Sequence, residues 1–478
     1  MKQFDVIVIG SGQGGVPLAV NLARQGKKIV LFERRALGGS CLNYGCYPSK
    51  AFLGAAFSIP RRDHAALWGI DVDSKVDFHK LMERVRGKRD SAYIRDALDR
   101  AGVKTVMAEA SFTGERTVSG GGELYQAATV VINTGNGPAI PPVPGLEGTP
   151  FITYYDFWEM NGLPPRFLIL GGGYIGVELG QGLARLGSEV HIVELAERIV
   201  AREEEDVSDI MKDALEADGV RFHLGRKVER AGYVNQHASS GGRDGSSSTV
   251  NINAYGARNG GAGGVFTMTL DNGVKLEGEA LLVATGQRPN TGELDAAAGG
   301  IELTGRSFIK VNDRFETSCP GVYAIGDVTG QPAFTHVAWE DNRRLLSILE
   351  GGDRRQGDRV LGYAFFTDPE VDRCGMTLDE AKKQGINARS ATLELGRVAR
   401  PWLLDETRGF MRLVIDADNG RLIGATIIGP HAGDLVHVVL DLMEAGAGWR
   451  LLESAVHIHP TFAEGLPTVA RRFLKKRG

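Results

Sequence analysis

Two copies of one pattern constrain the fold of this chain more than any other feature. In the first copy, an apolar segment at residues 3–9 runs into a glycine-rich turn, a helical stretch and a second apolar segment that ends at Glu33. The same order recurs later in the chain and ends at Glu194. In both copies the acidic residue stands 23 positions after the first glycine of the turn, Gly10 or Gly171 (33 − 10 and 194 − 171). A lone glycine-rich turn is a weak signal, but two copies with one spacing predict two βαβ units.

Each copy has the residue types that a dinucleotide-binding turn requires. The first glycine allows the tight turn, the second lets the backbone approach a pyrophosphate, and the third allows the helix to pack closely on the strand. The helix that follows presents free N–H groups to the phosphates, and the acidic residue accepts hydrogen bonds from ribose hydroxyls. The glycines concerned are Gly10, Gly12 and Gly15 in the first unit and Gly171, Gly173 and Gly176 in the second.

The charge of Glu194 bears on which dinucleotide the second unit binds. A carboxylate repels a 2′-phosphate, so we expect NAD rather than NADP at this unit. Arg198 stands four residues later and would weaken that preference.

Composition excludes several broad classes of protein. The 478 residues include 55 Lys and Arg and 59 Asp and Glu, and the net charge of −4 argues against a nucleic-acid binder or a polybasic membrane anchor. No apolar run is long enough to span a bilayer, and Asp5 interrupts an apolar start that would otherwise resemble a signal peptide. Four cysteines do not make a secreted disulfide framework in a chain of this length. We therefore expect a cytoplasmic protein.

Other stretches predict how the units are connected. Residues 137–145 are rich in proline, which predicts a stiff exit from the first unit. Residues 235–264 are rich in Gly, Ser and Asn, which predicts a mobile insertion or hairpin tip in the second unit. Further on, two apolar segments flank Asn419-Gly420 and amphipathic helices follow. That order predicts a separate α+β domain with an antiparallel strand pair.

Two cysteines five residues apart follow the first unit. Cys41 and Cys46 flank a loop that contains a glycine, so they can close a small disulfide ring. A zinc site would need further Cys or His ligands at short spacing, and none is near in the sequence, so we expect no metal site. Two buried free thiols remain an alternative. A flavin beside such a pair would be able to reduce it by two electrons.

The segment from Gly38 to Lys50 resembles the redox loop of the flavoprotein disulfide reductases, the family of lipoamide dehydrogenase, glutathione reductase and mercuric reductase. Three further segments resemble motifs of that family, in the family's order. They are residues 283–290, the return from the NAD domain; residues 322–327, the second FAD motif; and residues 457–464, the C-terminal His-Pro-Thr…Glu element. The resemblance covers essentially the whole chain apart from the insertion. It implies an α/β protein with two Rossmann-like dinucleotide-binding domains, for FAD and NAD, and a C-terminal α+β dimerisation domain.

The resemblance also implies domain limits and a set of residues in contact with FAD and NAD. The expected domains are an FAD-binding domain at 1–150, an NAD-binding domain at 151–280, the second part of the FAD-binding domain at 281–350 and an interface domain at 351–478. The residues expected to bind the two cofactors are Gly10, Gly12, Gly15, Glu33, Lys50, Thr134, Gly135, Gly171, Gly173, Tyr174, Gly176, Glu194, Gly286, Gly326 and Asp327.

On the same resemblance, each residue of the redox site has a role. Cys41 would be the interchange thiol that meets the substrate, and Cys46 would be the charge-transfer thiol packed on the flavin. Lys50 would lie near the flavin N5 edge, paired with Glu178. Tyr174 would cover the nicotinamide pocket and move when NAD enters.

A histidine near the C-terminus completes the expected site. His459, oriented by Glu464, would be the acid/base and would reach the disulfide of the other subunit of a homodimer. The role is physically reasonable, because a thiolate rather than a thiol attacks a disulfide and an imidazole can exchange the proton near working pH. His457 is the rival on the same segment, and only the family pattern chooses between the two.

Departures from the family pattern bear on the substrate. Tyr44 and Tyr47 stand where relatives commonly carry small aliphatic residues, which predicts an altered pocket wall around the disulfide. The chain ends without the extra thiol pair that mercuric reductase and large thioredoxin reductase need, and mercuric reductase also lacks the histidine seen here. Glutathione reductase usually carries a basic residue in place of Glu194. These departures favour an enzyme of the lipoamide-dehydrogenase kind.

We therefore expect a homodimeric flavoprotein that passes electrons from a dithiol to NAD, with dihydrolipoamide or a protein-bound lipoyl group as the dithiol. Two alternatives stay open. The first is an NAD(P)H-dependent reductase of another disulfide, a quinone or a metal ion. The second is a flavin-binding or assembly protein without turnover, which would have no physical need for the set Cys41, Cys46, His459 and Glu464.

Overall fold

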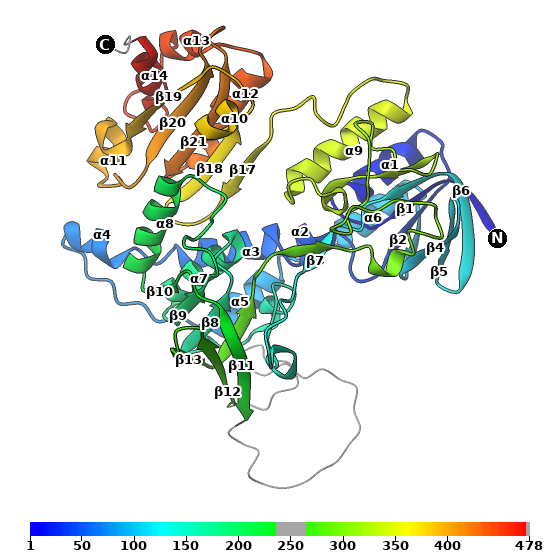
Figure 1. The fold of residues 1–478 in the computed structure, drawn as a ribbon, viewed down its shortest axis with the longest axis horizontal. Helices are drawn as coiled ribbons and strands as arrows, with labels where there is room; N and C mark the ends of the chain where they lie inside the picture. The colour runs from blue at the N-terminus through cyan, green and yellow to red at the C-terminus, as the bar shows by residue number, and fades with distance from the viewer. Residues whose placement is uncertain (236–263, 475–478) are drawn as a thin grey trace.

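The first lobe of the molecule is built on a seven-stranded sheet with β1 near its centre. The computed structural model describes residues 1–235 and 264–474, and Figure 1 shows them arranged in three lobes. The strands of the first sheet are β1 (Lys2–Ile9), β2 (Ile29–Glu33), β3 (Lys104–Met107), β4 (Ala110–Gly114), β5 (Thr117–Gly120), β6 (Glu123–Ile132) and β16 (Val322–Ala324). Their order is β3-β2-β1-β6-β5-β4, and β16 also pairs with β6. Because β16 is parallel to β6, the chain returns to this lobe after leaving it.

The first βαβ unit predicted from the sequence is present in this lobe. β1 lies parallel to both β2 and β6, and residues 6–9 are buried as expected of a strand covered on both faces. The helices of the lobe that pack around this unit are α1 (Gly15–Arg24), α6 (Ala92–Arg100) and α9 (Thr335–Leu349). The prediction of a strand at 3–9 and a second strand that ends at Glu33 is confirmed.

The second βαβ unit is also present and forms a second lobe. Its parallel strands, in the order β10-β9-β8-β14, are β8 (Arg166–Leu170), β9 (Glu189–Val193), β10 (Val220–His223) and β14 (Ala280–Val283). One face packs against α7 (Tyr174–Leu186) and α8 (Glu205–Ala217). The other face packs against an antiparallel sheet of β11 (Val228–Asn235), β12 (Gly264–Leu270) and β13 (Lys275–Gly278).

The predicted insertion at 235–264 lies outside the described residues, apart from its two end positions. These end positions, Asn235 and Gly264, face each other in the antiparallel pair of β11 and β12. The insertion therefore connects two paired strands at one end of the second lobe (Figure 1).

The third lobe is an antiparallel sheet covered by helices, as the sequence predicts for the C-terminal part. Its strands, in the order β17-β18-β21-β20-β19, are β17 (Gly362–Phe365), β18 (Glu370–Gly375), β19 (Ala388–Glu394), β20 (Phe410–Asp416) and β21 (Leu422–Gly429). The predicted strand pair around Asn419-Gly420 is β20 and β21. Its helices are α10 (Leu378–Lys383), α11 (Ala399–Leu403), α12 (Ala432–Glu444), α13 (Trp449–Ser454) and α14 (Gly465–Arg471).

Short elements connect the three lobes. A two-stranded sheet of β7 (Asn136–Pro138) and β15 (Gln287–Pro289) carries the chain out of the first lobe and back into it. The remaining α-helices follow the first unit and are α2 (Gly39–Asn43), α3 (Cys46–Ala56), α4 (Arg62–Leu67) and α5 (Phe78–Arg86). The described residues also form six 3-10 helices: η1 (Leu146–Gly148), η2 (Phe157–Glu159), η3 (Gly292–Leu294), η4 (Gly326–Thr329), η5 (Leu395–Arg397) and η6 (Arg472–Leu474).

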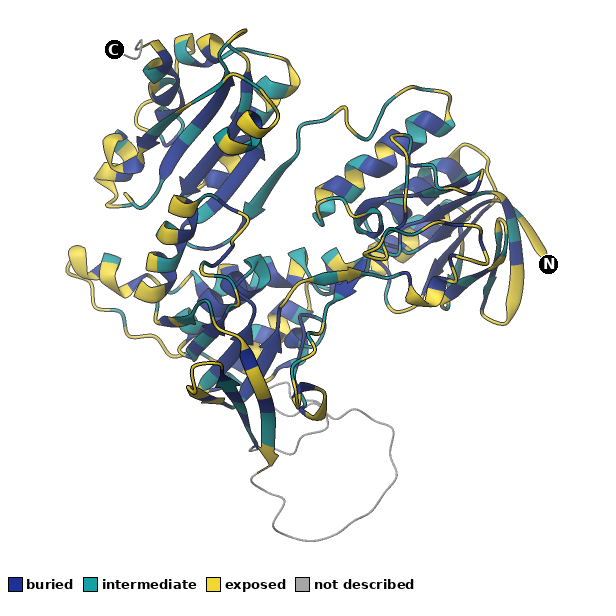
Figure 2. Ribbon diagram, in the orientation of Figure 1, coloured by how far each residue is buried: buried dark blue, intermediate teal, exposed yellow. Residues whose placement is uncertain are grey.

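The expected fold class is confirmed: two Rossmann-like units are followed by a C-terminal α+β domain. Figure 2 shows that the buried residues lie along the sheets at the centre of each lobe. Among residues 1–235 and 264–474, no helix has the length and apolar character needed to cross a membrane.

Candidate active site

The two glycine-rich turns have the same geometry. The first glycine of each turn has a positive φ, +104° at Gly10 and +115° at Gly171. Residues other than glycine rarely adopt such values. A Cβ on Gly15 would overlap the carbonyl oxygen of Gly10, and a Cβ on Gly176 would overlap that of Gly171. The third glycine therefore lets the helix approach the strand, as the sequence predicts.

The two acidic residues are held at these turns by matching hydrogen bonds. The backbone N–H of Ser11 donates to Glu33 at 3.1 Å, and the N–H of Gly172 donates to Glu194 at 2.6 Å. A second N–H, two residues after the carboxylate, donates to each, at 2.8 Å for Glu33 and 2.9 Å for Glu194. Both carboxylates are thereby oriented across the turn, where a ribose hydroxyl would donate to them.

A small cleft lies beside the first turn and fits part of a dinucleotide. It has a volume of about 70 Å³, and Gly10, Glu33 and Thr134 line it together with Asn290. The hydroxyl oxygen of Thr134 is buried and lacks a hydrogen-bond partner in the described part of the chain. Buried polar atoms are normally hydrogen-bonded, so this hydroxyl is suited to a bound polar group. Gly12 and Gly15 belong to the same turn. Because these glycines carry no side chains, the backbone of the turn is open to the pyrophosphate of FAD.

The second predicted FAD motif lies at η4, after β16. The N–H of Gly326 donates to Asp341 at 2.8 Å, which holds the turn against α9. Burial, with the neighbouring Asp341 carboxyl, raises the pKa of Asp327 to about 7. A buried carboxyl of this kind is stabilised by hydroxyl donors, which is what a ribityl chain offers. Gly135 directly precedes β7, and its carbonyl accepts a hydrogen bond from the N–H of Asn290 at 2.9 Å.

The two predicted redox cysteines lie together at the junction of α2 and α3. Both are free thiols, and each influences the pKa of the other. The two side chains therefore lie close enough to interact. The side-chain amide of Asn43 holds the loop by donating to the carbonyls of Leu37 and Gly39, both at 2.9 Å.

The two thiols have opposite electrostatic environments. Hydrogen bonds from Cys41 and Thr335, together with the charge of Lys50, lower the pKa of Cys46 against the opposing effect of burial. The hydrogen bond to Cys46, with burial, raises the pKa of Cys41. Cys46 is also the first residue of α3, where the helix dipole favours a thiolate. In the reduced pair, the negative charge therefore resides on Cys46.

Lys50 lies one turn along α3 from Cys46 and forms an ion pair with a buried carboxylate. Its Nζ is 3.1 Å from Oε2 of Glu178, which is itself buried on α7. The N–H of Phe366 also donates to Glu178, at 2.9 Å, and the Phe366 ring lies 4.2 Å from the ammonium nitrogen. These contacts fix both members of the ion pair beside the thiols.

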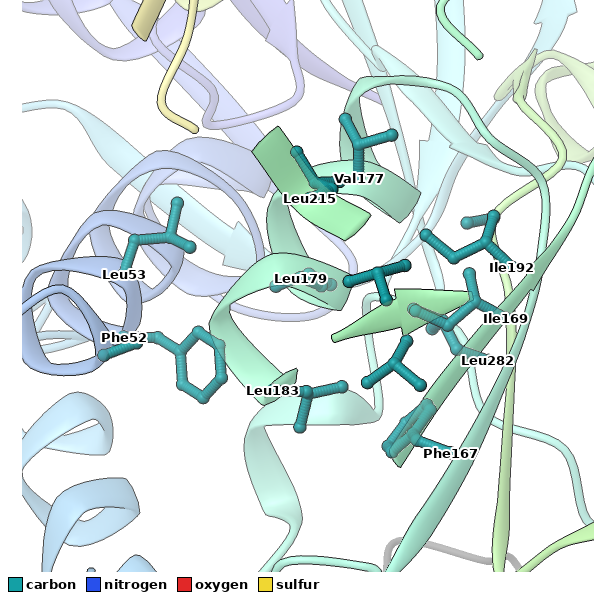
Figure 3. Close-up of a cluster of buried hydrophobic side chains, with 14 of the residues drawn as sticks. Phe52, Leu53, Phe167, Ile169, Val177, Leu179, Leu183, Ile192, Leu215 and Leu282 are labelled. Carbon is teal, nitrogen blue, oxygen red and sulfur yellow. The ribbon is translucent and has the colours of Figure 1, made fainter. Parts of the chain in front are cut away.

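The packing of α3 on α7 sets the position of this ion pair. A Cβ on Gly182 would lie 2.5 Å from the ring of Phe52, so only glycine leaves room for that ring on α7. Figure 3 shows Phe52 and Leu53 from α3 facing Leu179 and Leu183 from α7. The redox helix is therefore packed directly on the helix that follows the second glycine turn.

Tyr174 also lies close to the thiols, at the start of α7. Its ring stacks on Phe365 with 6.2 Å between centroids and lies 6.0 Å from the ring of Phe334. Burial raises the pKa of Tyr174, with contributions from Asp327 and Glu178. The structure thus brings together most of the predicted redox residues, namely Cys41, Cys46, Lys50, Tyr174, Glu178 and Asp327. The remaining predicted glycine, Gly286, lies between β14 and β15, where its carbonyl accepts the N–H of Ala139.

The predicted acid/base pair lies elsewhere in the chain. Nδ1 of His459 is 2.8 Å from Oε2 of Glu464, so the carboxylate orients the imidazole as expected. The pair lies between α13 and α14, which Figure 1 shows at the end of the third lobe away from α2 and α3. The His459 side chain is 72% exposed. Within one chain, the imidazole and the thiols therefore belong to separate surfaces.

Two residues of this region were missed by sequence reasoning. Thr335 lies 3.0 Å from Sγ of Cys46 and begins α9. The backbone of Phe366 donates to Glu178. Neither contact has a local signal, because both partners are separated from the site by more than a hundred residues.

The fold and these contacts define a class: a protein with two dinucleotide-binding units that meet at a pair of thiols. Comparison with known proteins agrees with that class. The family described as pyridine nucleotide-disulphide oxidoreductase matches residues 4–341, and its dimerisation domain matches residues 362–470. The chain therefore belongs to the pyridine nucleotide-disulphide oxidoreductase family, and the resemblance seen in the sequence is confirmed. Its cofactors are FAD and a nicotinamide dinucleotide.

Individual relatives carry different names. A dihydrolipoyl dehydrogenase of Thermus scotoductus is 32% identical, over 100% of this chain and 98% of its own length. A mercuric reductase of Lysinibacillus sphaericus is 30% identical, over 99% of this chain and 83% of its own length. The solved Cu(II) complex of the HOCl-induced flavoprotein disulfide reductase RclA from Escherichia coli is 26% identical with a TM-score of 0.83, covering 99% of this chain and 100% of that one. Relatives with different substrates are thus almost equally similar.

Proposed function

We propose that this protein oxidises a dithiol through Cys41 and Cys46 and passes the electrons to NAD, with dihydrolipoamide or a lipoyl group as the dithiol. The observation that carries this proposal is the asymmetry of the thiol pair: the pKa of Cys46 is lowered while that of Cys41 is raised. In thiol–disulfide exchange, the sulfur of lower pKa is the better leaving group. An attacking thiolate would therefore bond to Cys41 and release Cys46.

The exchange begins from the oxidised pair. One substrate thiol gives its proton to an imidazole, and the resulting thiolate attacks Sγ of Cys41. The bond between Cys41 and Cys46 breaks, and Cys46 leaves as a thiolate. The second substrate thiol then displaces Cys41, which takes the second proton, and the substrate leaves as a disulfide. The substrate has lost two electrons and two protons, and the pair has gained the two electrons.

The surroundings of Cys46 stabilise the thiolate that leaves. Thr335 is within hydrogen-bond distance at 3.0 Å, and the Lys50 charge lowers the pKa of the thiol. Bound FAD supplies the two-electron exchange with NAD that returns the pair to the oxidised state. Gly10, Gly12, Gly15, Glu33, Thr134 and Asp327 are the residues that would hold it.

His459 is the proposed acid/base, and it acts from the other subunit of a homodimer. Its Nδ1 is engaged by Glu464, so Nε2 is the atom that exchanges a proton with the substrate thiol. The high exposure of the imidazole and its distance along the fold from α2 and α3 support a site completed by a second chain. The match of residues 362–470 to a dimerisation domain supports the same assembly.

The aromatic residues beside Cys41 support an apolar dithiol as the substrate. Tyr47 is half exposed, and both Tyr47 and the thiol of Cys41 lie close enough to Tyr93 to raise the pKa of its phenol. Tyr44 instead packs its ring on Tyr155, with 4.6 Å between centroids. An aromatic wall with exposed ring surface suits the hydrocarbon part of a lipoyl group better than a charged peptide disulfide.

Glu194 supports NAD as the nicotinamide dinucleotide. Its carboxylate is held at the second glycine turn by two backbone N–H groups. A 2′-phosphate at that position would face a fixed negative charge.

A second candidate substrate is a thiophilic metal ion. The reduced pair would offer two neighbouring sulfur ligands, and thiolates prefer soft ions. Relatives named mercuric reductase and a relative solved as a Cu(II) complex support this candidate.

Parallel steady-state assays separate the candidates. The purified protein is supplied with NAD and dihydrolipoamide, with NADH and glutathione disulfide, and with NADH and Hg²⁺ or Cu²⁺. We expect the highest kcat/KM with dihydrolipoamide. A higher value with a metal ion would favour the second candidate. Turnover that persists in the Cys41→Ser variant, in any of the three assays, would contradict the thiol mechanism.

A further inference from the structure

A cavity with an excess of arginine lies beside α9. Its volume is about 300 Å³, and it is bounded by α9, the segment that leads into β17, and the last residue of α12. Its charged lining residues are Glu340, Arg343, Arg344, Arg354, Arg359 and Glu444. Four guanidinium groups therefore face a space with two carboxylates in its wall.

One carboxylate is shared by three of these arginines. Oε2 of Glu340 is 2.9 Å from Arg343, and Oε1 is 2.7 Å from Arg354. Nε of Arg344 lies 3.2 Å from the same Oε1 but does not form a hydrogen bond with it. Glu444 is engaged by the backbone N–H of Val360. With Asp341, which pairs with Arg359, three carboxylates lie beside the four arginines, and one positive charge remains uncompensated.

Two of the arginines are rigid and buried. The side chains of Arg344 and Arg359 are 4% and 5% exposed. Arg344 donates to the backbone carbonyls of Arg355 and Asp358, and Arg359 is paired with Asp341 at 2.7 Å. The Nε–H of each has no hydrogen-bond partner within residues 1–235 and 264–474. Both guanidinium groups are ion-paired, with Glu340 and Asp341, and each keeps one buried N–H donor that a further acceptor would satisfy.

We propose that this cavity binds a small multivalent oxyanion, phosphate or pyrophosphate. Guanidinium groups bind such oxyanions through paired N–H donors, and a low-dielectric wall strengthens the interaction. The volume admits a small anion with part of its hydration shell, because one water occupies about 30 Å³ in the liquid. The segment that contributes Arg354 and Arg359 lies between the two family matches, which end at residue 341 and begin again at residue 362.

The position of the cavity predicts what the bound anion does. α9 belongs to the first lobe, and Glu444 belongs to the third. An anion held by Arg343 and Arg354 therefore lies at the junction between the two lobes, where it offsets the excess positive charge of the arginines. The lining also includes His336, which follows Thr335, the residue in contact with Cys46.

Calorimetric titration of the FAD-loaded full-length protein with pyrophosphate, at constant ionic strength, tests the proposal. We expect one saturable site per chain. Arg354→Ala should weaken binding about tenfold, equivalent to about 1.4 kcal/mol. Arg397→Ala is the matched control, because Arg397 is an exposed guanidinium paired with Glu394 outside the cavity. Repeating the titration with phosphate and with sulfate determines which oxyanion binds most tightly.

A gain-of-binding variant keeps the test independent of misfolding. Glu340→Gln removes the carboxylate that competes for three arginines, so it should tighten pyrophosphate binding severalfold. Absence of saturable binding to the wild type would overturn the proposal, and so would an equal affinity in the Arg354→Ala and Arg397→Ala variants. If an acidic side chain from a second chain occupies the cavity, no saturable binding of pyrophosphate to the wild type will be seen. None of these readouts depends on which dithiol the enzyme uses.

Discussion

The hydroxyl of Thr335 lies 3.0 Å from Sγ of Cys46, although 289 positions separate the two residues in the chain. The contact joins the first residue of α9 to the first residue of α3. It places a hydrogen-bond donor on the thiol whose pKa is lowered, and it is one of the causes of that lowering. Thr335 is therefore a positioning residue for the thiolate.

Replacing Thr335 with valine should raise the pKa of Cys46 by about one unit, because a hydrogen bond to a charged group is lost. The rate of alkylation of Cys46 by iodoacetamide, followed against pH by mass spectrometry, measures this pKa. Thr335→Ser keeps the hydroxyl and should restore the wild-type profile. An unchanged profile in Thr335→Val would contradict the role of the contact.

Replacing His459 with alanine should lower kcat/KM for dihydrolipoamide about 10²- to 10⁴-fold, the range typical of a lost general base. Glu464→Gln should lower it less, because the imidazole remains but loses its orienting carboxylate. His457→Ala is the control, since its Nδ1 contacts only the carbonyl of Ala455 among the hydrogen bonds of the described residues. A larger loss in His457→Ala would reverse the choice between the two histidines.

The contribution of His459 across subunits has its own test. Cys41→Ser and His459→Ala homodimers should both be inactive with dihydrolipoamide. Mixed dimers, refolded or co-expressed with two affinity tags, should recover about half of the wild-type activity per dimer, because one of the two sites then has an intact thiol pair and an intact imidazole. Mixed dimers as inactive as their parents would place both groups in one chain.

Glu194→Arg should shift the preference from NAD toward NADP. The variant replaces a charge that repels the 2′-phosphate with one that attracts it. The readout is the ratio of kcat/KM for the two dinucleotides, which corrects for any general loss caused by freeing the Gly172 and Ala196 N–H groups. Glu189→Arg, at the start of the strand that Glu194 follows, is the control and should leave the ratio near the wild-type value. The assignment of Glu194 fails if both variants give the same ratio.

Asp372 makes stability depend on pH. It is buried on β18, both of its carboxylate oxygens lack hydrogen-bond partners among the described residues, and burial raises its pKa to about 8. The usual pKa of an aspartate is about 4, so between these values the folded state holds a proton that the unfolded state has released. Stability should therefore fall as pH rises from about 4 to about 8.

Asp372→Asn should remove that dependence. At pH 8 the variant should be more stable than the wild type by about 1 to 3 kcal/mol, because the amide does not ionise and the pH-dependent cost of the buried carboxyl is removed. Urea unfolding at pH 5 and pH 8 measures the difference. The exposed Asp441 on α12 provides the control, and Asp441→Asn should follow the wild-type pH dependence. A wild type equally stable at both values would contradict the account.

The features that could be predicted from the sequence are those whose residues lie close together in the chain. The two glycine turns and their acidic residues could be predicted because strand, turn, helix and carboxylate all lie within a short stretch. The redox loop and the histidine segment could be predicted because each carries its own motif. Thr335 could not be predicted, since only the folded chain brings α9 to α3.

Packing between distant elements also had no sequence signal. The fit of Phe52 against Gly182 depends on one small residue in a helix that has several glycines, and nothing local distinguishes it. The arginine cavity gathers residues from a helix and from the segment that follows it, and its charge excess is visible only when ion pairs are assigned. Both features depend on tertiary contacts rather than on periodicity.

The most direct test is thiol counting on the air-oxidised holoenzyme before and after one equivalent of dihydrolipoamide per subunit, without NAD, with alkylation and peptide mass spectrometry. We predict that Cys41 and Cys46 are linked and unreactive before the addition, and that both become alkylated after it, while the buried Cys319 and Cys374 do not change. If dihydrolipoamide is oxidised while Cys41 and Cys46 keep the same alkylation state throughout, the thiol pair is not the path of the electrons.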